Sequence, residues 1–365
     1  MKKEKTSSRI LTFDLMRGYF LVAIILDHLY FFPSGLDIWS ARGNMYVSAA
    51  EGFFILSGIV LGIVRGRKLI EKPFKVAAKL LLQRSLQLYI ASIVLMLIFT
   101  LIGWQFLGNP GLKPGIVGAD INPFQLIWGA LTFQYLYGWA DYLRLYAIFI
   151  LFSPLALLLL RKGLWWVVLA ISAVVWALFP LSPLGTAELS QVFSWQLVFF
   201  AGFVIGFHWD NILSWWRSLP LLRRKVIARV IISTSIVALI ANIIIYFGGE
   251  FSPTLYALNE YLDKILFNKE RLTVPRLALF ALWFSAAFML FRKFEPVIVK
   301  FFGWILQPFG TNSLYVYILQ AFVIFFLHLY FTASEWYINL IISVFAVGII
   351  WLATHYKFLM KIIPR

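Results

Sequence analysis

Long apolar runs, separated by short polar stretches, make up most of this chain. Each run is close to the roughly 20 residues that an α-helix needs to cross the hydrocarbon core of a bilayer. The pattern predicts an all-α polytopic membrane protein with about ten transmembrane helices, and residues 1–365 are expected to form a single integral-membrane domain. The predicted spans are residues 10–32, 48–64, 84–107, 143–160, 164–180, 190–208, 227–247, 274–291, 311–331 and 336–354.

One further apolar segment, residues 124–139, can be read either as a crossing or as a re-entrant or interfacial segment. Cytoplasmic loops of membrane proteins carry an excess of Lys and Arg. A full crossing at 124–139 would invert all later segments and move Arg223, Arg224 and Lys225 to the outer side. We therefore expect a re-entrant or interfacial segment, with both chain termini on the inner side and with residues 108–123 and 248–273 as outer loops.

The composition agrees with this class of protein. Hydrophobic residues make up 62% of the chain and charged residues 13%, whereas soluble domains are about a quarter charged. The net charge of +16 comes from basic clusters beside predicted spans, where they attract anionic lipid headgroups. Nucleic-acid binding is not expected, because no soluble domain would carry it. The chain has no cysteine and four scattered histidines, so we predict no disulfide, no cysteine nucleophile and no metal site.

The first predicted span carries a polar stripe. Arg17 and His28 are eleven positions apart, which is almost three helical turns, so they share a face and lie roughly 16 Å apart along the axis. Asp14 precedes this arginine by one turn, and Asp27 is next to the histidine. Ionisable groups within a membrane span face a bundle interior or a wet cavity and are functional candidates. We expect the chemistry to lie along this stripe.

Glu51 lies near the outer end of the second predicted span, at a depth similar to that of His28. It is either an interfacial carboxylate that faces water or a group that orients the imidazole and stabilises it after proton abstraction. Gly58, seven residues further on, forms with Gly62 a small-xxx-small pattern that lets another helix approach closely.

Basic residues gather where the second span ends and the third begins. Arg65, Arg67, Lys68 and Arg84 are expected near the inner end of the first span as well. They can serve simply as a topology signal. They can also bind a phosphate-rich cytoplasmic ligand, because guanidinium groups pair with phosphate in a bidentate manner.

Two more arginines, Arg144 and Arg276, begin the fourth and eighth predicted spans at the outer side. Long basic side chains at such positions usually reach out to the interface. The other possibility is that they attract an anionic acyl group or a charged acceptor.

Several short motifs are spread over most of the chain: DLMRG (14–18), DH (27–28), SAAEGFFILSG (48–58), RSLQLY (84–89), DYLRLY (141–146), SWQLVFFAG (194–202) and GTNSLY (310–315). In these motifs the chain resembles the OpgC family, whose members are membrane proteins implicated in succinylating periplasmic glucans. The spacing of Arg17 and His28 is also similar to that of the wider acyltransferase type three superfamily.

The resemblance implies an acyltransferase in the cytoplasmic membrane. Acyl-CoA, either succinyl-CoA or acetyl-CoA, would be the cosubstrate, and a hydroxyl of an extracytoplasmic glycan or similar molecule would be the acceptor. His28 would be the general base, oriented by Glu51 or Asp27, and Arg17 would contact the donor or polarise its thioester. The candidates for the donor phosphates are Arg65, Arg67 and Arg84.

One departure from the superfamily pattern lies in the motif SLYVYILQ (313–320), which ends in Gln320 where many members have a histidine. An amide hydrogen-bonds but does not act as an acid or base near neutral pH. A role that depends on a second histidine is therefore not expected.

The alternative reading is a polytopic transporter or flippase for a glycan, a lipid or an organic anion. That class predicts an internal repeat with broken helices at corresponding places in the two halves. No convincing repeat is present, and the chemistry-bearing residues concentrate in the first third of the chain. This asymmetry favours an enzyme.

Overall fold

A computed structural model describes residues 10–139, 142–178, 187–361 and 363. All regular structure in these residues is helical. The ten predicted spans each contain a helix: α1 (Leu11–Leu29), α3 (Ala49–Leu61), α4 (Phe74–Trp104), α6 (Tyr142–Arg161), α7 (Trp165–Ala177), α8 (Ala187–Phe207), α10 (Leu221–Gly248), α12 (Val274–Lys293), α14 (Ser313–Tyr330) and α15 (Trp336–His355). The remaining α-helices are α2 (Asp37–Ser40), α5 (Pro123–Leu131), α9 (Trp209–Ser218), α11 (Pro253–Tyr261) and α13 (Glu295–Thr311).

The chain is a multi-pass membrane protein, but a count of about ten spans is not confirmed. Among the described residues, seven helices are long and apolar enough to cross a bilayer, or eight if α8 and α9, bent by 67°, form one span. Helix α1 carries three charged side chains, Asp14, Arg17 and Asp27, and α7 has only 13 residues. Helix α1 therefore lacks the apolar composition of an ordinary crossing, and α7 lacks the length.

The ambiguous segment 124–139 contains a short helix, α5, followed by turns. Asn122 caps this helix by accepting a hydrogen bond from the Phe124 amide at 2.8 Å, and Pro123 occupies its first turn. Nine residues span roughly 14 Å, about half the hydrocarbon thickness of a bilayer. This length agrees with a re-entrant or interfacial segment.

The predicted close approach at Gly58 and Gly62 is confirmed. Their partner is α8, which carries the matching glycines Gly202 and Gly206. A Cβ atom on Gly58 would collide with the carbonyl oxygen of Phe199, so the two backbones touch along this line. Such contacts are typical of membrane helices, whose association depends on close van der Waals packing.

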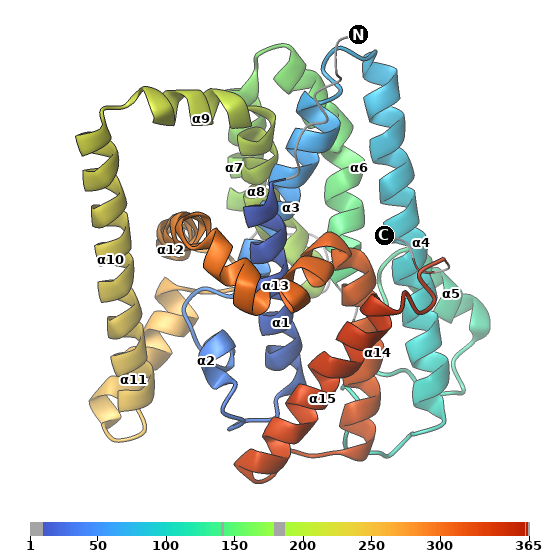
Figure 1. Ribbon diagram of the computed structural model, residues 1–365. Coiled ribbons are helices and arrows are strands. Elements are labelled where there is room, and N and C mark those ends of the chain that lie inside the picture. The colour runs from blue at the N-terminus through green and yellow to red at the C-terminus, as the bar shows by residue number, and fades with distance from the viewer. Residues whose placement is uncertain (1–9, 140–141, 179–186, 362, 364–365) are drawn as a thin grey trace.

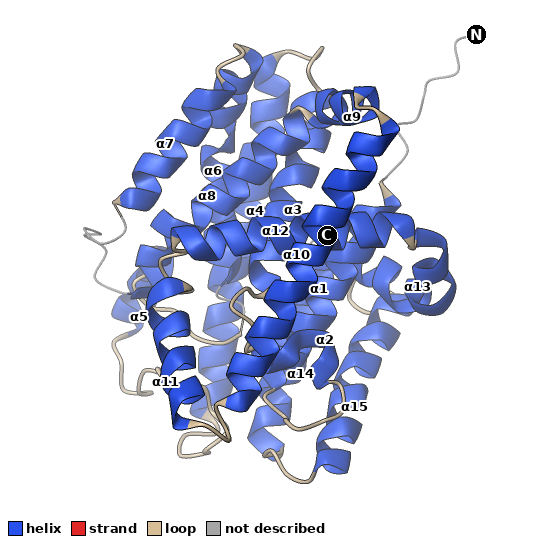
Figure 2. Cartoon of the chain, turned by 90° about the vertical axis from the view of Figure 1, so that its left-hand side faces the viewer, coloured by secondary structure: helices blue, strands red, loops and turns tan. Residues whose placement is uncertain are grey.

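Helix α1 lies in the centre of the molecule, with α4 and α10 near opposite sides in the view of Figure 1. Helix α9 lies across the upper left of this view, between the upper ends of α8 and α10, and α12 is seen nearly end-on, so it crosses α1 and α10 steeply. In the view turned by 90°, α12 runs across the picture and crosses α10 (Figure 2). Because α1 contacts α3, α12, α13 and α14, its polar stripe is enclosed by other helices over most of its length.

Candidate active site

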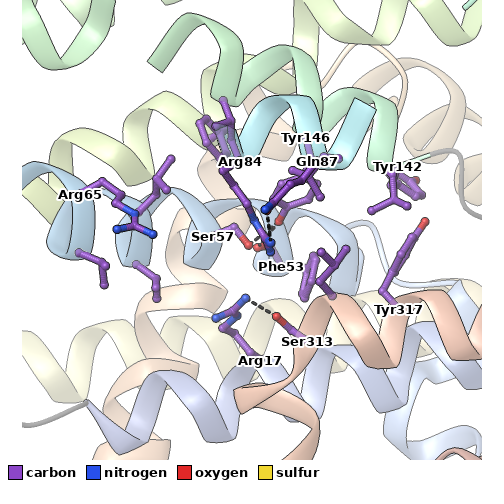
Figure 3. A pocket seen from close by; sticks show the side chains of 18 of the residues that line it. Arg17, Phe53, Ser57, Arg65, Arg84, Gln87, Tyr142, Tyr146, Ser313 and Tyr317 are labelled. Carbon is purple, nitrogen blue, oxygen red and sulfur yellow. Dashed lines mark hydrogen bonds between the residues drawn. The ribbon is translucent and has the colours of Figure 1, made fainter. Parts of the chain in front are cut away.

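A cavity of about 490 Å³ opens between α1, α3, α4, α6 and α14. Three guanidinium groups line it, those of Arg17, Arg65 and Arg84, whereas no described residue of its wall is acidic. Arg17 and Arg84 reach toward it from opposite walls (Figure 3). We call this space the arginine cavity. Its excess of positive charge in a largely apolar surrounding suits an anionic ligand.

Helix α14 positions Arg17, the central residue of the predicted stripe. The Nη2 atom of Arg17 donates a hydrogen bond to Oγ of Ser313, which is the first residue of α14. The guanidinium carbon also lies 5.9 Å from the centre of the Phe53 ring, within the range of a cation–π contact. These contacts hold the Arg17 side chain at the cavity wall.

The two arginines at the end of α3 have different surroundings. They lie in a π-helical turn, Gly62–Arg67, where residues two apart point to nearly opposite sides. Arg65 accordingly lines the arginine cavity, while Arg67 forms an ion pair with Asp210 at the start of α9. Of the three predicted phosphate ligands, the structure therefore brings Arg65 and Arg84 together and places Arg67 in another contact.

Polar side chains from three helices complete the wall near Arg84. Its Nη1 atom donates to Gln87 Oε1 at 3.4 Å, one turn along α4. On the facing side, the Tyr146 hydroxyl donates to Ser57 and lies 3.2 Å from the Phe53 carbonyl oxygen. This contact fixes α6 against α3 at the level of Arg17.

A second cavity, of about 200 Å³, surrounds the other end of the polar stripe. Its described lining includes His28, Asp27, Arg42 and Lys269, and we call it the histidine cavity. The His28 imidazole lies 5.5 Å, centre to centre, from the indole ring of Trp139. The predicted base thus lies at a cavity with a carboxylate beside it in sequence and two cations in the wall.

The two cavities share part of their walls. Phe53, Tyr142 and Tyr317 line both of them, so these three rings form the junction between the arginine cavity and the histidine cavity. Figure 3 shows the three rings near one another, beyond Arg17. Arg17 and His28, which the sequence places on one face of α1, therefore lie at two spaces that adjoin.

Glu51 has a different partner from the one expected. Its carboxylate accepts a hydrogen bond from Nε of Arg276 at 2.6 Å and from the Ser48 amide at 3.1 Å, which makes it both an ion-pair partner and part of the cap of α3. Glu51 is fully buried and is not among the described residues that line either cavity. Asp27 is the carboxylate that lines the histidine cavity.

Arg276 itself is 2% exposed, so the expectation of an interfacial side chain at this position is wrong.

Sequence reasoning missed several polar residues of the site. Ser57, Tyr146 and Ser313 each bear a hydroxyl at the arginine cavity, and Tyr142 and Tyr317 lie at the junction. All except Tyr317 fall within the family-like motifs, and hydroxyl groups within apolar spans were the signal available for them. The motif residue Asp141 lies outside the described residues.

Gln320, which departs from the superfamily pattern, is fully buried in α14. Neither its amide oxygen nor its nitrogen has a hydrogen-bond partner among the described residues. His328, near the end of the same helix, has its Nε2 atom 2.9 Å from the Leu29 carbonyl oxygen.

Within the described part of the chain, no group of three or more His, Cys, Asp or Glu side chains is arranged to hold a metal ion.

Comparison with known proteins gives one match. Residues 9–362 match the family model described as OpgC protein, which is nearly the whole chain. No curated protein and no solved structure matches the chain.

Proposed function

The chain belongs to the OpgC family, and from this premise we propose that it is a membrane-embedded O-acyltransferase. It would move an acyl group, succinyl or acetyl, from a cytoplasmic acyl-CoA to a hydroxyl of an extracytoplasmic glycan or a related acceptor. The observation that carries this proposal is the pair of adjoining cavities along α1. One is lined by three arginines, the other by a histidine and a carboxylate, and the same three rings line both.

The arginine cavity supports the binding of an acyl-CoA. Coenzyme A carries several phosphates, and Arg65 and Arg84 offer guanidinium groups that pair with phosphate in a bidentate manner. In this proposal the Arg65 end of the molecule faces the cytoplasm, in keeping with the positive-inside rule. Arg67, which pairs with Asp210, would hold α9 in place instead of contacting the donor.

The histidine cavity supports base catalysis at the acceptor. A sugar hydroxyl is a weak nucleophile unless its proton is removed as it attacks, and an imidazole has a suitable pKa for this task. His28 would take the proton while the acceptor oxygen bonds to the thioester carbonyl carbon. The carbon–sulfur bond then breaks, and CoA leaves as a thiolate that takes up a proton. In the alternative route, the His28 imidazole nitrogen attacks the thioester and CoA leaves, and the acceptor hydroxyl then takes the acyl group from the imidazole as it loses its proton; the overall balance is the same.

Two side chains would assist the transfer at His28. Asp27 would stabilise the imidazolium that forms after proton abstraction, since it lines the same cavity. Arg17, held by Ser313 beside the junction, would contact the donor or polarise its thioester carbonyl. The low dielectric of the enclosed site strengthens both effects.

The proposal is tested by transfer from labelled succinyl-CoA and acetyl-CoA to a soluble glucan in proteoliposomes. His28→Ala is expected to lower the rate by about 100-fold or more, the usual contribution of a positioned general base. The matched control is His355→Ala, because His355 lies at the end of α15 and stacks on Trp351. Undiminished transfer by a folded His28→Ala variant would exclude His28 as the general base. Absence of transfer from any acyl-CoA by the wild type would overturn the proposed acyltransferase function.

A further inference from the structure

A third cavity, of about 360 Å³, lies on the other side of α1, between α1, α3, α10 and α12. We call it the lateral crevice. Most of its wall is apolar, and large rings contribute much of that surface: Phe20, Trp39, Phe280, Trp283 and Phe284. On α12 the lining extends from Phe280 to Leu290, a length of roughly 15 Å at 1.5 Å per residue.

The lateral crevice adjoins the histidine cavity. Asp27, Gly43, Ser48 and Ala49 line both spaces. Gly43, Ser48 and Ala49 are small, so little side-chain bulk lies in this shared wall. A polar group beside His28 and an apolar tail in the crevice would therefore occupy neighbouring spaces.

The crevice borders on the side of the molecule that faces lipid. Of the 28 residues of α10, only Ser235 and Asn242 are buried, and Val237 is 66% exposed. Figure 1 shows α10 at the edge of the molecule, where it packs against α12 and follows α9 at its upper end. Hydrocarbon chains of the bilayer therefore have access to this side.

The wall of the crevice also contains a buried donor on the ring of Trp283. The indole nitrogen Nε1 of Trp283 has no hydrogen-bond partner among the described residues, although it is shielded from solvent. A buried N–H without an acceptor is costly, and an oxygen carried by an occupant would satisfy it. An ester or ether oxygen near the head of an amphiphile has this chemistry.

From these observations we propose that the acceptor is a lipid-linked saccharide, whose hydrocarbon chain lies in the lateral crevice while its hydroxyl-bearing head lies beside His28. The proposal deepens the acyltransferase function and rests on it. We choose a hydrocarbon chain as the occupant because the space is apolar, borders on lipid and adjoins the candidate active site. Burial of each methylene is expected to increase affinity about fourfold.

The first test compares maltose with dodecyl maltoside as acceptors in proteoliposomes, with the detergent kept below solubilising concentrations. Wild-type protein is expected to favour dodecyl maltoside at least tenfold in kcat/KM. Ala287→Trp places a large ring in the crevice and should abolish this preference while transfer to maltose continues. Ala281→Trp, on the exposed side of α12, is the matched control and should behave like wild type.

Because Ala287→Trp can also overpack α12, Leu239→Trp on the more exposed α10 is a second variant, with Val237→Trp as its control. Equal kcat/KM for the two acceptors in wild type, or a preference that survives both filling variants, would overturn the proposal.

A second readout does not depend on catalysis. A photoreactive dodecyl maltoside should label α10 and α12 in the wild type and much less in the two filling variants. Labelling without any acyl transfer would refute the acyltransferase function but support the crevice as a lipid site. Transfer to both acceptors without labelling or preference would refute the lipid-linked acceptor and leave the acyltransferase function intact.

Discussion

Arg276 donates to the carboxylate of Glu51 at 2.6 Å, although the two residues are 225 positions apart in the sequence. Both side chains are almost completely buried, at 2% and 0% exposure. Arg276 also donates from Nη1 to the Phe267 carbonyl oxygen at 2.9 Å. The pair thus ties the start of α3 to α12 and to the loop that precedes it.

This ion pair predicts a loss of stability that depends on whether one or both partners are removed. Glu51→Leu or Arg276→Met leaves an uncompensated buried charge and should cost about 3–5 kcal/mol, while the double variant should recover much of the loss. Thermal unfolding in detergent measures it, with Glu260→Gln in the exposed Lys264 pair as the control. If the double variant is stable but has lost acyl transfer, Glu51 acts on the chemistry as well.

The partner of Glu51 illustrates what sequence reasoning could not supply. Hydropathy places each residue at a depth along its own helix, and it sufficed to predict a helix in each of ten apolar segments. The helical period put Arg17 and His28 on one face of the first helix. It does not say which helices are neighbours, because that depends on packing between distant segments. Glu51 and His28 share a depth, yet the lateral neighbour of Glu51 is Arg276.

The same limit explains Arg67 and helix α13. Arg65 and Arg67 look equivalent in sequence, but the helical turn directs only Arg65 to the cavity and Arg67 to Asp210. Helix α13 (Glu295–Thr311) lies between two predicted spans, 274–291 and 311–331, and was not itself predicted. Its contact with α1, where Gly18 and Gly310 allow close approach, is not visible in local hydropathy.

The arginine cavity predicts a selective loss of donor binding. Arg65→Gln and Arg84→Gln should each weaken the binding of succinyl-CoA or acetyl-CoA about tenfold or more, since a charge-assisted hydrogen bond contributes about 1.5–3 kcal/mol. A ligand that binds only the folded protein raises its melting temperature, so thermal shifts at several donor concentrations measure this. Arg67→Gln is the control and should keep wild-type affinity, because its guanidinium pairs with Asp210. Equal losses in all three variants would argue for a general charge effect.

The junction of the two cavities predicts a split between binding and turnover. Phe53→Trp enlarges a ring that lines both cavities and should lower kcat at least tenfold, while the donor-dependent thermal shift stays close to that of wild type. Phe301→Trp, at a position 59% exposed on α13, controls for the added ring. Unchanged kcat in Phe53→Trp would show that the acyl group does not pass this point.

The contact of α3 with α8 predicts a glycine effect that depends on position. Gly58→Ala would drive a methyl group into the Phe199 carbonyl, and the required shift should cost about 1–3 kcal/mol of stability. Gly348→Ala, in α15, has nothing within 4 Å of the new methyl group and should be neutral or slightly stabilising. Melting temperatures in detergent compare the two. Equal effects would mean that intrinsic helix propensity, not the α3–α8 contact, governs both sites.

The short helix α5 leads to a prediction about topology. If segment 124–139 does not cross the bilayer, Lys264 lies outside and Lys225 inside. Both side chains are exposed, and the chain has no cysteine of its own, so Lys264→Cys and Lys225→Cys each introduce a single thiol. A membrane-impermeant maleimide added to intact cells should label the first variant and should label the second only after permeabilisation. The reverse pattern would mean that the chain crosses once more between the two cavity-lining helices α4 and α6, and would exchange the sides assigned to donor and acceptor for every later helix.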